Sequence, residues 1–258
     1  MMRHALFAAL LWCIAVPVQA DGVANRLFDA MGLPGLISAF AEDGRQSMQA
    51  IDRNFLGGDG GDVFYETARR LYDPARMEAE LRTSFAAQVD PADAEQALVF
   101  FDSAQGQDIV RLEVEARAAI VDESVEAAVR AQASNANDAV LRLLEVRDLV
   151  AVNTDIAVAA RLAFFDGLLA AAPGMDVPDV DGQRAAIEDE TRAWITGYYM
   201  LVGSALEANA LDTYAAFWET DVGQGVDAAL STAFEESYVA LSYGLGQVVG
   251  RLLPQNDL

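Results

Sequence analysis

Apolar residues recur at every third or fourth position along most of this 258-residue chain, whereas the alternating pattern of a half-buried strand is hard to find. This spacing gives a helix one apolar face, and a chain that repeats it must bury those faces against other helices. With 53% apolar residues and no long polar tract, the chain has enough material for a packed core. The sequence therefore predicts an all-α fold with no β-sheet.

Local signals indicate where individual helices begin and end. Asp73-Pro74 and Asp90-Pro91 each have an N-cap aspartate followed by proline at the first helical position, and predict helices over about 74–89 and 91–102. Longer helices are expected after them, with breaks at the asparagine and proline clusters. Their expected ranges are about 104–133, 183–206 and 222–251, and the breaks lie near 135–137 and 173–178.

The first twenty residues have the build of a secretory signal peptide. Residues 1–4 carry positive charge, residues 5–18 are apolar, and Ala20 is a small residue suited to cleavage. A retained membrane anchor is the alternative, but about 14 apolar residues are few for a span that needs roughly 20. We expect cleavage after Ala20, a periplasmic location, and no membrane span after signal cleavage.

Cleavage would narrow the available chemistry, because the only cysteine, Cys13, and the only histidine, His4, lie in this segment. Without thiol or imidazole, the mature chain lacks disulfides, the usual ligands of zinc, haem and iron–sulfur clusters, and Ser-His-Asp or Cys-His catalysis. All 17 basic residues are arginine, so lysine-dependent nucleotide and pyridoxal chemistry is excluded as well. We expect no cofactor and no metal centre of the transition-metal type.

The acidic balance of the chain, a net charge of −23, argues against nucleic acid as a partner, because phosphates need a basic footprint. Two acidic loops resemble fragments of calcium sites. Residues 57–62 match one glycine–aspartate unit of a calcium-binding β-roll, and residues 179–188 resemble part of an EF-hand loop. Because the β-roll unit occurs once and the EF-hand match is incomplete, we expect both loops to be ordinary corners, with Asp62 as the N-cap of the next helix. Weak calcium binding by these acidic loops is the alternative.

One motif occurs twice. Residues 100–107, FFDSAQGQ, return 117 positions later as residues 217–224, FWETDVGQ. Six of the eight positions agree in type, and each copy precedes a long helix. The repetition predicts two related multi-helix halves, an internal duplication, with a first helical repeat over 21–140 and a second over 141–258.

This motif also carries a family resemblance. An aromatic pair, a hydroxyl residue, a glycine and a glutamine in an exported alanine-rich helical chain resembles the bacterial family known as domain of unknown function 2059. The similar part runs from 90 to about 128 and includes the ion pair Glu113/Arg117; the second copy has Leu230 and Phe234 at those positions. The resemblance implies a small all-helical exported domain and no particular activity.

The motif has a structural interpretation. Ser103 and Thr220 stand where a hydroxyl can accept a free amide hydrogen of the next helix. The glycines would allow close approach of a neighbouring helix, and the aromatic rings would pack the corner into the core. An anion site at the helix start is the alternative. The candidate structural residues are Phe100, Phe101, Ser103, Gly106, Phe217, Trp218, Thr220 and Gly223.

Two further features are candidates for contacts with partners. Arg117 interrupts an apolar helix face, so it is a candidate ligand contact, for a carboxylate in a groove; the alternative is a surface ion pair with Glu113. Ser242, Gly246 and Gly250 form a small-residue ridge, which predicts a tight helix crossing inside the chain, with a homodimer through the C-terminal helix or surface membrane contact as alternatives.

These observations favour a non-enzymatic binding or interaction module of the cell envelope, whose partner is an unknown envelope protein or small ligand. The rival is a carboxylate-based hydrolase acting on envelope glycans, so whether the protein is an enzyme stays open. An enzyme should have two acids with raised pKa values converging in a deep cleft. A binding module should have an apolar groove between helices.

Overall fold

The computed structural model describes residues 18–253, whose regular structure is all helical with no strand, so the predicted all-α class is confirmed for this part of the chain. The predicted signal peptide lies almost wholly outside the described residues. The helices of the first part are α1 (Val18–Ala30), α2 (Leu33–Ile51), η1 (Asp52–Leu56), α3 (Gly61–Leu71), α4 (Pro74–Gln88), α5 (Pro91–Phe101), α6 (Ala104–Ala119), α7 (Glu123–Gln132) and η2 (Ala133–Asn135). Those that follow are α8 (Asp138–Val146), α9 (Leu149–Ala171), η3 (Asp181–Gln183), α10 (Arg184–Ser204), α11 (Ala210–Trp218) and α12 (Asp221–Leu252).

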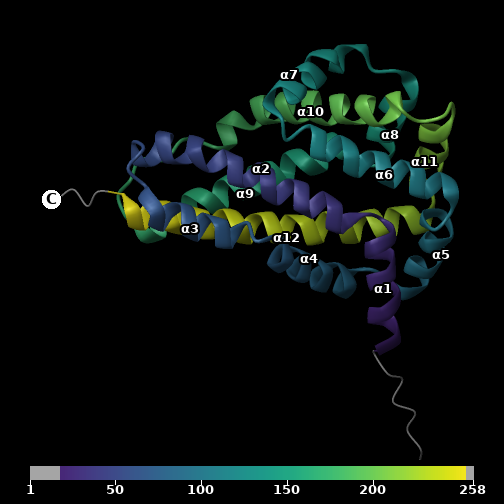
Figure 1. Ribbon diagram of the computed structural model, residues 1–258, viewed down its shortest axis with the longest axis horizontal. Helices are drawn as coiled ribbons and strands as arrows, with labels where there is room; N and C mark the ends of the chain where they lie inside the picture. The colour runs from purple at the N-terminus through teal and green to yellow at the C-terminus, as the bar shows by residue number, and fades with distance from the viewer. Residues whose placement is uncertain (1–17, 254–258) are drawn as a thin grey trace, which may run out of the picture.

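The long helix α12 forms the axis of the fold, and α9 lies along it (Figure 1). On one side α12 contacts α3, α4 and α5, while α10 packs on α7 and α9 at the opposite edge of the molecule. Buried residues from α1 through α12 belong to one continuous apolar cluster. The first half and the second half of the chain therefore share a core.

The aspartate–proline signals for helix starts are confirmed. Asp73 is the N-cap of α4 and accepts a hydrogen bond from the backbone amide of Arg76 at 2.9 Å. Asp90 is the N-cap of α5 and accepts from the amide of Ala92 at 2.8 Å. Proline follows each cap at the first helical position, where a backbone N–H would have no partner within the helix, so the missing N–H of proline costs no hydrogen bond.

The single helix expected over about 104–133 is wrong, because the chain turns between α6 and α7. Asp122 is the N-cap of α7 and accepts hydrogen bonds from the amides of Ser124, at 2.8 Å, and Val125. Helical periodicity continues through the break, so the apolar pattern alone conceals it. An aspartate within the run, followed by glutamate and serine, was the available signal.

The glycine-rich corner at 57–62 is built differently from the prediction. Gly60, and not Asp62, is the N-cap residue of α3. Asp52 stabilises the corner: its buried carboxylate accepts hydrogen bonds from the Gly60 amide and the Tyr65 hydroxyl, both at 2.9 Å. Gly57 and Gly58 have positive φ angles, which glycine adopts without steric strain. Asp62 lies in the first turn of α3 and makes no cap.

The small-residue ridge of α12 packs against α9 within the same chain. A Cβ atom on Gly246 would overlap the carbonyl oxygen of Phe164, and one on Gly250 would lie 2.7 Å from that of Leu168. The predicted tight crossing is therefore present. Because α9 covers Gly246 and Gly250, a homodimer cannot use this part of the ridge while the fold stays intact. No helix in the described range 18–253 has the length and apolar character to cross a membrane.

Candidate functional site

The first copy of the repeated motif caps a helix. Ser103 Oγ accepts a hydrogen bond from the Gly106 amide at 3.0 Å and donates to the Phe100 carbonyl at 2.6 Å. Gln107 Nε2 then reaches back to the Phe101 carbonyl at 2.5 Å. A side chain at Gly106 would overlap the Phe100 carbonyl oxygen, so glycine is required there by close backbone approach.

The second copy repeats these bonds. Thr220 Oγ1 accepts from the Gly223 amide at 3.0 Å and donates to the Phe217 carbonyl at 2.7 Å. Gln224 Nε2 reaches the Trp218 carbonyl at 2.6 Å, and a Cβ on Gly223 would overlap the Phe217 carbonyl oxygen. The two copies thus have one local geometry. This likeness supports the predicted duplication, which, like the repeat boundaries at 140 and 141, stays a prediction.

The two copies meet in the core. The Phe100 and Phe217 rings stack with centroids 4.6 Å apart, and Phe101 meets Phe217 edge to face at 5.2 Å. Phe101 and Trp218 have fully buried side chains and lie 5.9 Å apart. The motif therefore joins the two halves of the chain through its aromatic rings.

We expect the two cap hydroxyls to contribute about equally to stability, because the bonds that they accept from the Gly106 and Gly223 amides are both 3.0 Å long. Ser103→Ala and Thr220→Ala should each lower the free energy of unfolding by about 1 kcal/mol, the usual effect of losing a helix N-cap. Urea denaturation followed by circular dichroism measures this. Loss of a ligand interaction without any loss of stability would instead identify the motif as a binding site.

Beside this junction, Glu113 of α6 has a buried carboxylate. Its oxygens accept hydrogen bonds from the hydroxyls of Tyr199 and Tyr214, each at 3.2 Å, while the Tyr198 hydroxyl donates to its backbone carbonyl at 3.0 Å. Burial raises the pKa of Glu113 above its ordinary value, although Arg147 and the two hydroxyl donors oppose this. Burial also raises the pKa of Tyr199 and Tyr214, so both hydroxyls stay protonated near neutral pH.

Arg147 forms a second buried group with Asp227. Its Nε and Nη2 atoms donate to one Asp227 oxygen, at 3.1 and 2.5 Å, and Nη1 donates to the Tyr199 hydroxyl at 3.2 Å. The guanidinium also lies 4.1 Å from the centre of the Trp218 ring. Burial works to lower the pKa of Arg147, but Asp227 raises it well above its usual value, so the guanidinium stays charged.

Arg117 does not pair with Glu113, as the i, i+4 spacing suggested; that interpretation is wrong. Its Nη2 atom pairs with Asp43 of α2 at 2.8 Å, and its side chain is 11% exposed. The reason lies in the tertiary structure, because the buried Glu113 carboxylate is bound by the tyrosines of α10 and α11. Arg117 Nη1 is buried and has no hydrogen-bond partner. The ring centre of Trp194 lies 5.5 Å from the guanidinium.

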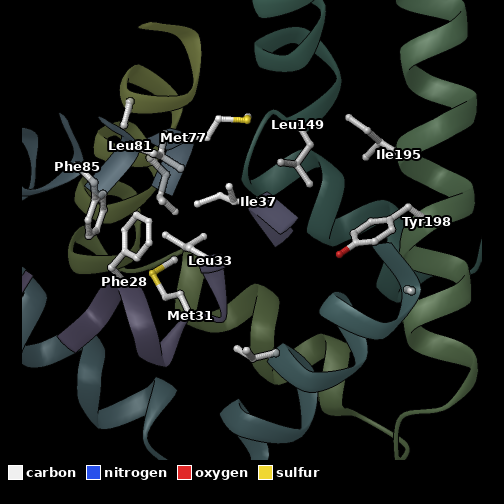
Figure 2. Packing of buried hydrophobic residues seen from close by; sticks show 14 of the residues in the cluster. Phe28, Met31, Leu33, Ile37, Met77, Leu81, Phe85, Leu149, Ile195 and Tyr198 are labelled. Atoms are coloured by element: carbon white, nitrogen blue, oxygen red, sulfur yellow. The ribbon is translucent and has the colours of Figure 1, made fainter. Parts of the chain in front are cut away.

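These groups border a cavity of about 240 Å³ between the helices. Its charged lining comprises Glu113, Arg117, Arg147 and Asp227, and half-buried Trp194 lines it as well. Figure 2 shows part of the apolar side, with Ile37 and Leu149 near the centre of the view and the Tyr198 hydroxyl pointing inward from α10. The apolar wall includes Leu33, Ile37, Met77, Leu81, Leu149, Ile156 and Ile195.

The second copy of the motif helix contributes to the same cavity. Leu230 and Phe234, which occupy the positions of Glu113 and Arg117 in the second copy, both line it. At these two positions the first half of the chain thus supplies charged groups, and the second half supplies apolar ones. A mostly apolar lining with a few polar groups is the composition of a small-molecule site.

Sequence reasoning found Arg117 but missed Tyr199, Tyr214, Arg147 and Asp227. One signal was present for Asp227, a charged residue on the helix face that also carries Val226 and Leu230. The others lie on α8, α10 and α11, and only the packing of these helices brings them to Glu113.

The raised pKa of Glu113 has a consequence for stability. An acid with a folded-state pKa above its unfolded value binds its proton more tightly in the folded protein, so stability falls as pH rises from about 4.5 toward the folded-state pKa. Glu113→Gln removes this titration and keeps an acceptor for the tyrosines. Relative to wild type, we expect the variant to gain up to about 1.4 kcal/mol per pH unit in that window. Parallel urea titrations between pH 4 and pH 8 measure the difference; a pH-independent difference would contradict a raised pKa.

The acidic loops that resembled calcium sites do not form a cluster of metal ligands in the described residues. In the described residues, no group of three or more acidic, histidine or cysteine side chains is placed to hold a metal ion. In the segment 179–188, which ends inside α10, Asp179 accepts a hydrogen bond from the Gly182 amide at 3.0 Å. Compared with models of known protein families, with curated proteins and with solved structures, the chain has no match. The resemblance to domain of unknown function 2059 therefore stays a prediction.

Proposed function

We propose that this protein is a non-enzymatic binding module of the cell envelope and that its interhelical cavity holds a small, largely apolar ligand. The observation that carries the proposal is the cavity of about 240 Å³ with an extended apolar wall. A buried, mostly apolar space with a few convergent polar groups is typical of ligand sites. At about 30 Å³ per water-sized unit, a volume of about 240 Å³ fits on the order of eight non-hydrogen atoms.

The rival function, hydrolysis of envelope glycans, has one observation in its favour. Glu113, with its raised pKa, and Asp227 border the same cavity. Both carboxylates are held by protein groups, Glu113 by two tyrosines and Asp227 by Arg147. A polymeric glycan is also far larger than the cavity. The geometry favours binding. We therefore expect the purified protein to have no glycan-hydrolysing activity that Glu113→Gln abolishes.

A cavity-filling variant tests the binding proposal. Ser231 of α12 lines the cavity, whereas its neighbour Thr232 is exposed, so Ser231→Leu and Thr232→Leu form a matched pair. Using 1-octanol as the probe and calorimetry as the readout, we expect Ser231→Leu to abolish binding and Thr232→Leu to bind like wild type. Equal binding by both variants, or no binding by wild type, would refute the proposal.

The envelope location rests on the signal-like residues 1–20. Helix α1 begins at Val18, so cleavage after Ala20 would remove its first three residues. We expect the exported protein to begin at Asp21 and to contain no thiol. Intact-mass measurement of the exported protein checks this; a retained Met1 or a modified Cys13 would contradict it.

A further inference from the structure

The two arginines at the cavity differ in how completely they are bonded. Arg147 uses Nε, Nη1 and Nη2, with Asp227 and Tyr199 as acceptors, and its guanidinium lies over the Trp218 ring. Arg117 makes a bond through Nη2 alone, to Asp43, and its buried Nη1 has no acceptor. A guanidinium carries five N–H donors, and a buried donor without a partner costs free energy. Of the two arginines at this cavity, Arg117 is therefore the one with an unpaired donor; the buried Nε1–H of Trp218 also has no acceptor, but it is uncharged.

The surroundings of Arg117 allow an exchange of partners. Asp43 is nearly half exposed, with 46% of its side chain accessible, so water can solvate it when the ion pair opens. Tyr238 lies close by on α12, and burial raises its pKa to about 12, with Arg117 opposing and Asp43 adding to the rise. Its hydroxyl is thus protonated and can donate a hydrogen bond to an acceptor placed beside Arg117.

The charges of the cavity also favour an anion over a cation. The Arg147–Asp227 pair is neutral as a whole, and the raised pKa of Glu113 reduces its negative charge. A cationic ligand would be stabilised by cation–π contact with accessible aromatic ring faces. The protein's own guanidinium groups already occupy the faces of Trp194 and Trp218.

We infer that the cavity takes an amphipathic monocarboxylate, with its carboxylate on Arg117 and its short apolar tail against the α2, α4 and α9 wall. A carboxylate matches the planar fork of a guanidinium and replaces Asp43 as its partner. The tail length follows from the cavity volume, which accommodates about eight carbon atoms. This inference rests on the proposed function and specifies its ligand class.

The test uses three probes with a chain of eight carbon atoms: octanoate, whose carboxyl carbon is one of the eight, 1-octanol and octyltrimethylammonium. Calorimetry at pH 7.5 with the purified full-length protein is expected to show octanoate binding about tenfold or more tightly than 1-octanol, since hydrogen bonds to charged groups are the stronger ones. Equal affinities, or tighter binding of the cation, would overturn the inference while leaving the binding proposal intact. Binding of none of the three probes would refute the binding proposal itself.

Matched variants locate the head group. Arg117→Gln should reduce octanoate affinity to the level of 1-octanol and leave 1-octanol unchanged. Arg142→Gln, which removes an exposed arginine paired with Glu219, should change neither. Asp43→Asn removes the competing carboxylate and should raise octanoate affinity several-fold, which keeps the inference testable if Arg117→Gln fails to fold. Unchanged or weaker octanoate binding by Asp43→Asn would overturn it.

Discussion

Replacing Trp218 by alanine is expected to lower the free energy of unfolding by about 3–5 kcal/mol, the range for deleting a large buried aromatic side chain. Trp218 is fully buried, contacts the Phe101 and Phe217 rings, and supports the guanidinium of Arg147. The substitution would therefore leave a cavity and also loosen a buried ion pair. Urea denaturation monitored by circular dichroism measures the loss.

The relative sizes of the stability losses in different variants test this prediction more sharply than one value does. Phe101→Ala should fall in the same range, and the double variant should lose less than the sum of the two, because the rings are in contact. Val99, which is 78% exposed, provides the control, since Val99→Ala should change stability by less than about 0.5 kcal/mol. A Trp218→Ala effect no larger than that of Thr220→Ala would mean that the aromatic junction does not hold the halves together.

Gly246→Ala is expected to destabilise the protein by about 2–3 kcal/mol, although alanine is the better helix former. The added methyl would overlap the Phe164 carbonyl oxygen, and backbone atoms of α9 cannot move aside as a side chain can. The two longest helices would have to separate along their crossing. Thermal and urea unfolding of the purified variant measure the change.

The control for this substitution lies two residues away on the same helix. A Cβ on Gly244 would lie 3.3 Å from a terminal methyl carbon of Leu71, which can shift. Gly244→Ala should therefore be neutral or stabilising, by up to about 1 kcal/mol. Equal effects of Gly244→Ala and Gly246→Ala would show that helix propensity, and not the crossing with α9, decides both.

The sequence by itself determined the helical class, the starts of α4 and α5, and the form of the repeated motif. Each of these depends on residues within a few positions of one another: periodic apolar side chains, Asp73 and Asp90 before prolines, and Ser103 or Thr220 three residues before a glycine. Local hydrogen bonds and steric limits act at that range and do not need the rest of the fold. The small residues of α12 likewise indicated a tight crossing without naming the partner helix.

Only the tertiary structure decided what surrounds Glu113 and Arg117. The spacing of four residues suggested an ion pair between them, but the folded chain brings Tyr199 and Tyr214 to Glu113 and Asp43 to Arg117. These partners come from helices 74 to 101 residues away, and nothing in local propensity selects them. The physical reason is that a buried carboxylate needs donors wherever packing provides them, whereas an exposed i, i+4 pair contributes little. The cavity arises in the same way, because its walls exist only after α2, α4, α9, α10 and α12 have packed.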